Sequence, residues 1–191
     1  MRALADEAGV NLGAATYHFG SKENLYIETI MRCFRPISEE RIRLLRQAER
    51  ETNGKPIPLE TIIDCMVRPA LMAVLKNPYF PALFARNLFI PPPFLTEVMA
   101  KAGRPVHEPF ITALSRTLPN LPKETILIRE MFSRGVLLMF LSRIPMQKSP
   151  EFYECVLKEM VAFIAAGLRA DSTISDADLP SMALSRPAPA I

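Results

Sequence analysis

The chain has 191 residues, of which 49% are hydrophobic and 23% charged, enough for one large domain or two smaller ones. Its formal net charge is only +3, which excludes a polybasic segment for non-specific binding of nucleic acid or membranes. The three cysteines lack CxxC spacing and the apolar runs are too short to span a bilayer, so we expect a cytoplasmic protein without disulfides or membrane contact.

Residues 1–20 carry the pattern of two short helices joined by a tight turn. Gly9 suits a helix stop in the left-handed conformation, and Asn11 is a good N-cap for a second helix over residues 12–18. Small residues at the start of that second helix, such as Gly13, let its backbone approach a partner closely. Two short helices around a glycine turn are typical of a helix-turn-helix DNA reader.

A long helix follows over residues 22–51, capped at its start by Ser21. Pro36 lies inside it, and because a proline removes one helical hydrogen bond, we expect a kink or a break there. The segment 52–58 is rich in the turn residues Asn, Gly and Pro. It predicts a boundary between two domains.

Apolar helices broken by prolines follow, without any alternating pattern of the kind that a strand would need. The predicted helices cover residues 59–75, 80–89, 94–102, 105–118, 123–143 and 150–169. The expected fold is all-α. It comprises an incomplete helix-turn-helix domain with its connecting helix over 1–50, a larger helical ligand-binding and dimerisation domain over 51–170, and a disordered tail over 171–191.

The larger predicted domain is rich in Met and Phe, which line adaptable small-molecule pockets as well as cores. We therefore expect a mostly apolar cavity between residues 59 and 141. The candidate lining residues are Met66, Met72, Phe84, Arg86, His107, Arg129 and Phe132. The wide apolar surface of the helices at 123–143 and 150–169 predicts a homodimer, with the small side chain of Ala165 at its centre.

Catalytic motifs are missing from the sequence. It contains no GxSxG, P-loop, HExxH or GxGxxG pattern, and only two histidines, which are far apart. With histidines only at positions 18 and 107, we expect neither a catalytic triad nor a histidine-rich metal site. We therefore expect no enzyme activity, no metal and no cofactor.

The string AGVNLGAATYHFGSKENLY resembles the recognition segment of the TetR family of bacterial transcription regulators. The likeness covers the glycine turn, the short helix ending in Tyr17-His18-Phe19 and the Ser21-Lys22-Glu23 start of the long helix. It implies a homodimeric repressor that binds double-stranded operator DNA and leaves it when a small-molecule effector binds. The residues that it implies as DNA contacts are Asn11, Gly13, Ala14, Thr16, Tyr17, His18 and Lys22.

Two further stretches, around Arg35-Pro36-Ile37 and over 118–124, resemble the branch of that family to which the regulator CecR belongs. Readers of the family have three helices, whereas this sequence has only the last two. We therefore expect either that Met1 is an internal residue of a longer protein or that the reader is degraded. In the second case the chain would be a helical dimer that binds a ligand or a protein and no longer binds DNA.

Overall fold

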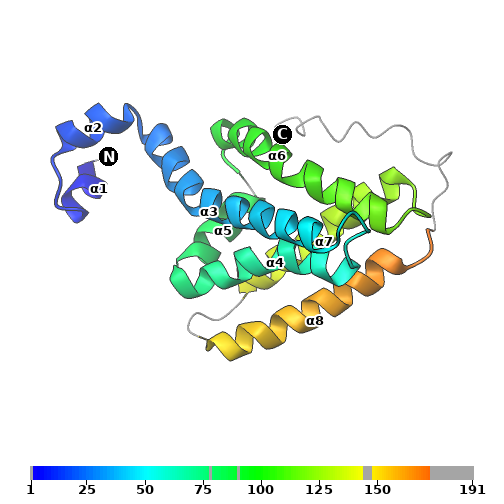
Figure 1. Cartoon of the computed structure of the whole chain (residues 1–191). Helices are drawn as coiled ribbons and strands as arrows, with labels where there is room; N and C mark the ends of the chain where they lie inside the picture. The colour runs from blue at the N-terminus through cyan, green and yellow to red at the C-terminus, as the bar shows by residue number, and fades with distance from the viewer. Residues whose placement is uncertain (1, 78, 90, 144–147, 173–191) are drawn as a thin grey trace. The chain divides into compact units, whose positions relative to one another are not determined.

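The computed structural model describes residues 2–77, 79–89, 91–143 and 148–172, without the side chains of residues 84–86, 88 and 89. Within these ranges the chain forms helices and no strand, as predicted, and every helix is too short or too polar to cross a membrane. The predicted tail lies almost wholly outside the described residues. The helices (Figure 1) are α1 (Arg2–Glu7), α2 (Leu12–Phe19), α3 (Lys22–Glu51), α4 (Leu59–Lys76), α5 (Phe80–Phe89), α6 (Pro93–Thr117), α7 (Lys123–Arg143) and α8 (Pro150–Arg169).

The chain divides into two compact units, Met1–Pro36 and Ile37–Ile191, so the division falls inside α3. The linker 52–58 lies in the second unit, where it turns the chain from α3 into α4. Arg116 Nη2 donates to the carbonyl of Gly54 (3.0 Å), and Thr117 Oγ1 donates to the carbonyl of Ile57 (2.8 Å). These two bonds tie the linker to the end of α6.

Local signals at helix ends shape the first unit. Gly9 and Gly20 have φ of +63° and +69°, a conformation that strains residues with a Cβ atom. The Gly20 N–H donates to the carbonyl of Thr16 (2.8 Å) and so closes the end of α2. Ala5 and Ile30 are buried, whereas Leu4 stays largely exposed.

The central helix of the second unit is α4, which packs against α5, α6, α7 and α8. Apolar residues cover most of its circumference, as expected for a helix that is surrounded by others. Its buried residues are Leu59, Ile62, Ile63, Cys65, Met66, Val67, Pro69, Ala70, Leu71 and Val74. The core of this unit therefore lies around α4.

The helices end near Pro78 and Pro91 as predicted, but one predicted break is absent. The two helices expected at 94–102 and 105–118 form one helix, α6, with Pro105 and Pro109 inside it. A proline removes one backbone hydrogen bond. The helix tolerates that loss because Leu95 before the prolines and Phe110 after them are both buried. Tertiary packing here overrides the helix break that a proline favours. Helix α3 likewise continues through Pro36, where a kink or a break was expected.

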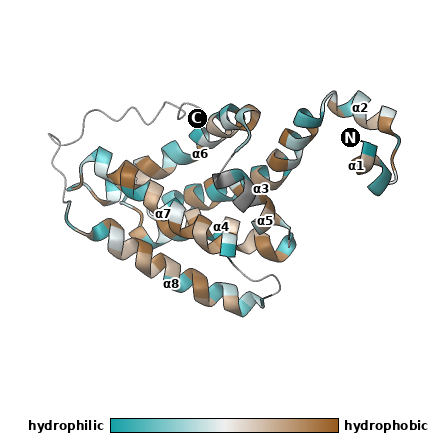
Figure 2. Ribbon diagram, turned by 180° about the vertical axis from the view of Figure 1, so that it is seen from behind, coloured by the Kyte–Doolittle hydropathy of each residue, from teal (hydrophilic) through white to brown (hydrophobic). Residues whose placement is uncertain are grey.

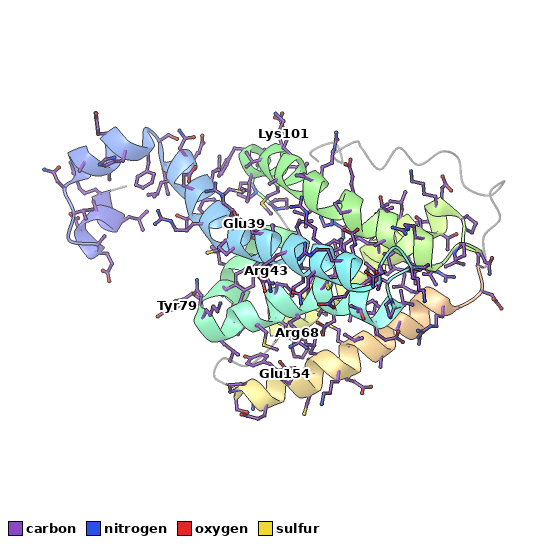
Figure 3. The ribbon with its side chains drawn as sticks, in the orientation of Figure 1. Glu39, Arg43, Arg68, Tyr79, Lys101 and Glu154 are labelled. Atoms are coloured by element: carbon purple, nitrogen blue, oxygen red, sulfur yellow. The ribbon has the colours of Figure 1, made fainter. Side chains whose placement is uncertain are left out.

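Ion pairs connect α4 with α8. Arg68 of α4 contacts Asp64 (Nε–Oδ2 2.8 Å) on its own helix and Glu154 (Nη1–Oε1 2.7 Å) on α8. Figure 3 labels Arg68 and Glu154, which come from the two facing helices. A second pair, between Arg169 Nη2 and Glu60 Oε1 (2.6 Å), joins the other ends of α4 and α8. Partly exposed pairs add little stability, so their main effect is to set the direction of α8 along α4.

Candidate functional site

An exposed surface of small and polar side chains lies along α2 and the start of α3. All the predicted DNA-contact residues are exposed: Asn11, Gly13, Ala14, Thr16, Tyr17, His18 and Lys22. Tyr17 is 87% exposed, and its ring meets that of His18 edge to face at 5.4 Å between centroids. The exposure of all these residues leaves the surface accessible to a partner.

The Asn11 side chain caps α2. Its Oδ1 accepts a hydrogen bond from the Gly13 N–H at 2.7 Å, which satisfies one free donor of the first turn. A Cβ atom on Gly13 would lie only 3.1 Å from that oxygen, so glycine leaves room for the cap. In the same helix Thr16 Oγ1 donates to the carbonyl of Leu12 (3.0 Å), which leaves its lone pairs to accept a hydrogen bond.

Asn11→Ala removes this cap and is expected to cost α2 about 1 kcal/mol, which makes local opening about fivefold more frequent. Amide hydrogen exchange at Gly13 and its neighbours measures that change. Asn11→Ser keeps an acceptor oxygen and should restore most of the protection. Equal exchange in Asn11→Ala and the unchanged chain would contradict the capping role.

A second group of polar side chains lies in the second unit. It consists of Arg41 of α3, His107 of α6, and Glu130 and Arg134 of α7, and we call it the Glu130 cluster. Glu130 is only 2% exposed. Its Oε2 lies 3.1 Å from Arg134 Nε, and its Oε1 lies 3.4 Å from His107 Nδ1. Arg134 Nη1 and His107 Nε2 are 3.3 Å apart.

Charge within the Glu130 cluster is not balanced. Two arginines face one carboxylate, so the net charge is +1 when the imidazole is neutral. Burial lowers the pKa of the Arg41 guanidinium to about 10, and the charge of Glu130 opposes part of that change. Three buried atoms, Arg41 Nε, Glu130 Oε1 and Arg134 Nε, make no aligned hydrogen bond to any described residue. Arg134 Nε and Glu130 Oε1 still have oppositely charged or polar partners at 3.1 and 3.4 Å, so their charges are met although their hydrogen bonds are not aligned.

Gly103, one turn before His107 on α6, controls the position of the imidazole ring. A Cβ atom on Gly103 would lie 3.3 Å from both Cδ2 and Nε2 of His107. That distance is tighter than ordinary contact, so the ring would have to shift by a few tenths of an ångström. The absence of a side chain at this position therefore helps to place His107 beside Glu130.

The residues that the sequence suggested for a pocket lie in different parts of the structure. His107 joins the Glu130 cluster, Met66 is buried in α4, and Met72 is half-buried. Arg129 instead donates to the main-chain oxygens of Leu168 (3.0 Å), Ala170 (2.5 Å) and Asp171 (2.9 Å), which closes the end of α8. Phe132 is 62% exposed on α7. The side chains of Phe84 and Arg86 lie outside the described part of the structure.

Glu130 is the residue of this site that sequence reasoning missed. It resembles half of an ordinary surface pair, because Glu130 and Arg134 have the i, i+4 spacing that solvated helices favour. The feature of the sequence that could have indicated a buried Glu130 was its position in the apolar helix α7. No group of three His, Cys, Asp or Glu side chains in the described ranges is arranged to hold a metal ion.

A set of exposed large apolar side chains comes from α7 and α8. We call it the α7–α8 face, and it comprises Met131, Phe132, Met139, Phe152 and Phe163. Figure 2 shows hydrophobic residues along the length of α8. Ala165, expected at the interface, is 1% exposed and faces the core of its own unit instead. Phe163, two residues earlier on the same helix, points outward and is 65% exposed.

Comparison with known protein families gives two matches. Residues 1–29 match the family of bacterial regulatory proteins called the tetR family, and residues 64–167 match the tetracyclin repressor-like C-terminal domain. No curated protein and no solved structure gave a match. The first match covers α1, α2 and the start of α3, and the second covers most of the helices around α4. The chain therefore belongs to the TetR family of bacterial transcription regulators, with a helix-turn-helix DNA-binding domain followed by a ligand-binding domain.

Proposed function

We propose that the chain is a homodimeric repressor that binds operator DNA through α2 and leaves it when a small-molecule effector binds the second unit. The observation that carries this proposal is the exposed surface along α2 and the start of α3, on which every residue implied as a DNA contact is accessible. Its chemistry suits the major groove, because small residues allow close approach and polar residues can reach the phosphates.

The expected contacts fall into two kinds. Gly13 and Ala14 allow α2 to approach base edges, and the Ala14 methyl can meet the methyl group of a thymine. Tyr17 and His18 reach phosphate oxygens on one side of the groove. Lys22 adds a positive charge in the first turn of α3, where backbone N–H groups also favour an anion.

The α7–α8 face is the proposed dimer interface. Its large side chains are exposed in the single chain, although soluble proteins seldom leave such a set uncovered. Two such faces related by a two-fold axis form a four-helix interface. To bind an operator, such a dimer has to present its two copies of α2 to successive major grooves, which lie about 34–36 Å apart along DNA.

We explain how an effector releases the repressor from its operator by two states of the dimer. An effector that binds one spacing of the two recognition helices more tightly shifts the population towards it. If that spacing does not match successive grooves, the repressor leaves the operator. Helix α3 is the covalent link, because it begins in the first unit and ends in the second.

Lys22→Ala is expected to weaken operator binding and to make its salt dependence shallower by about one unit in log–log slope, because one phosphate contact is lost. Fluorescence anisotropy with promoter fragments of the protein's own operon, at several salt concentrations, measures both. Lys55→Ala is the matched control, since it removes one exposed lysine from the linker 52–58 and should change neither. If the unchanged chain binds no promoter fragment, the proposal is wrong and a helical dimer without DNA binding takes its place.

A further inference from the structure

We propose that His107 is a proton-dependent switch in the Glu130 cluster. Its neutral imidazole bonds Arg134 and keeps that guanidinium beside Glu130, whereas its protonated form takes the place of Arg134 as the cation that Glu130 binds. The switch goes beyond the proposed function, because it makes the second unit respond to pH independently of DNA or an effector.

The contact with Arg134 determines which nitrogen of the neutral ring carries the hydrogen. Arg134 Nη1 lies 3.3 Å from His107 Nε2. A guanidinium group has donors and no acceptor, so Nε2 has to be the accepting nitrogen. The hydrogen of the neutral ring then sits on Nδ1, which lies 3.4 Å from Glu130 Oε1. Each ring nitrogen therefore faces a group of the matching kind.

A third contact closes these side chains into a ring. Arg134 Nε lies 3.1 Å from Glu130 Oε2, so each of the three side chains contacts the other two. Glu130 and Arg134 belong to α7 and His107 to α6, so the ring joins the two helices. It lies where α6 has fewer backbone hydrogen bonds of its own, because Pro105 and Pro109 lack an N–H group.

A proton on Nε2 breaks the ring at Arg134. It turns the accepting nitrogen into a donor, and two donors cannot share a hydrogen bond. It also places a positive imidazolium next to a positive guanidinium, and these like charges repel. Glu130, only 2% exposed, keeps one cationic partner in both states: Arg134 before the proton arrives and His107 after it.

Both moving groups have access to water. The His107 side chain is 32% exposed and can exchange protons with the solvent. The Arg134 side chain is 36% exposed, so its released guanidinium can be solvated without crossing the core. Imidazole side chains change charge between about pH 5 and 8, which sets the range in which the switch operates.

Arg41 of α3 also favours the release of Arg134. Its charge interacts with both Glu130 and Arg134, so a protonated His107 would otherwise be the third cation around one carboxylate. Helix α4 packs against α6 as well. The remaining charged side chains of α4, and those next to His107 on α6, are exposed or paired with other residues: Glu60, Asp64, Arg68, Lys76, Arg104 and Glu108.

The test follows the imidazole rings of the full chain by NMR between about pH 5 and 8. The sequence has two histidines, so His18→Gln assigns their signals by removing one set. At high pH the nitrogen chemical shifts of His107 should identify the tautomer with hydrogen on Nδ1. A nuclear Overhauser effect should connect the ring with the Arg134 side chain there, and it should disappear when His107 gains its proton.

Arg134→Gln measures the coupling between the two charges. Without the guanidinium, the midpoint of the His107 titration should move to higher pH by about half a unit or more, because a nearby like charge opposes protonation. Arg43→Gln is the matched control and should move nothing, since Arg43 is well exposed on α3 and pairs with Glu40 (2.7 Å). The exposed ring of His18 should keep one midpoint throughout and serves as an internal reference.

Hydrogen on Nε2 at high pH overturns the proposal. So does a His107 ring that keeps one charge state over the whole range, or an effect between the ring and Arg134 that persists after protonation. An unshifted His107 midpoint in Arg134→Gln also overturns it if circular dichroism melting shows that this variant is folded; if it is unfolded, the measurements on the unchanged chain decide. No DNA is present, so none of these results bears on the proposed repressor function.

Discussion

Glu130→Gln is expected to lower the free energy of unfolding by about 3 kcal/mol. Glutamine keeps the shape of the side chain but removes the one negative charge of the Glu130 cluster, which leaves Arg41 and Arg134 uncompensated. The value is at the low end for a broken buried pair, because the Arg134 side chain is 36% exposed and water screens part of its charge. Urea unfolding at fixed protein concentration measures the change.

Glu40→Gln is the matched control, with an expected loss below about 0.5 kcal/mol. It makes the same chemical change in a salt bridge to Arg43 in which both side chains are well exposed. A double variant of Glu130→Gln with Arg134→Gln should regain part of the stability, since it removes one of the unbalanced charges. If Glu130→Gln and Glu40→Gln lost similar amounts of unfolding free energy, the charge of Glu130 would contribute no more than that of an exposed salt bridge.

Phe163→Glu is expected to weaken the homodimer at least about 100-fold, because a large aromatic side chain in the middle of an interface is a typical hot spot. The two-fold symmetry places the change twice in each dimer and sets like charges near one another. Sedimentation equilibrium at micromolar protein should then find mainly monomers. The subunit should remain folded, because Phe163 projects outward and fills no core position.

Tyr79→Glu is the control for this variant. Tyr79 is 74% exposed at the turn between α4 and α5, away from the α7–α8 face, and Figure 3 labels it. It should remain a dimer of unchanged affinity. Monomers of the unchanged chain would refute the proposed homodimer. An equally tight Phe163→Glu dimer would place the interface elsewhere.

The sequence predicted the first unit well because its structure depends on neighbours in the chain. The glycine stop at Gly9, the cap at Asn11 and the helix start at Ser21 all act within a few residues, and each is found in the structure. The all-α class followed from periodicity alone. Such signals are readable because each has its partner within one helical turn.

Features that depend on distant residues were harder to predict. Pro105 and Pro109 lie inside α6 because burial on both sides of them outweighs the lost hydrogen bonds. Glu130 and Arg134 have the spacing of a surface pair, and only the approach of α3 and α6 makes them a buried cluster. The direction of Ala165 depended on the packing of α8 against α4, which no pattern within α8 specifies.

The missing side chain of Gly103 has a consequence for how such a sensor could diversify. A methyl group there would displace the His107 ring by a few tenths of an ångström. A single change of Gly103 to alanine would then retune the geometry around Glu130 while leaving both arginines intact. Natural variation or directed evolution could therefore adjust the Glu130 cluster through a position that takes part in none of its ion pairs.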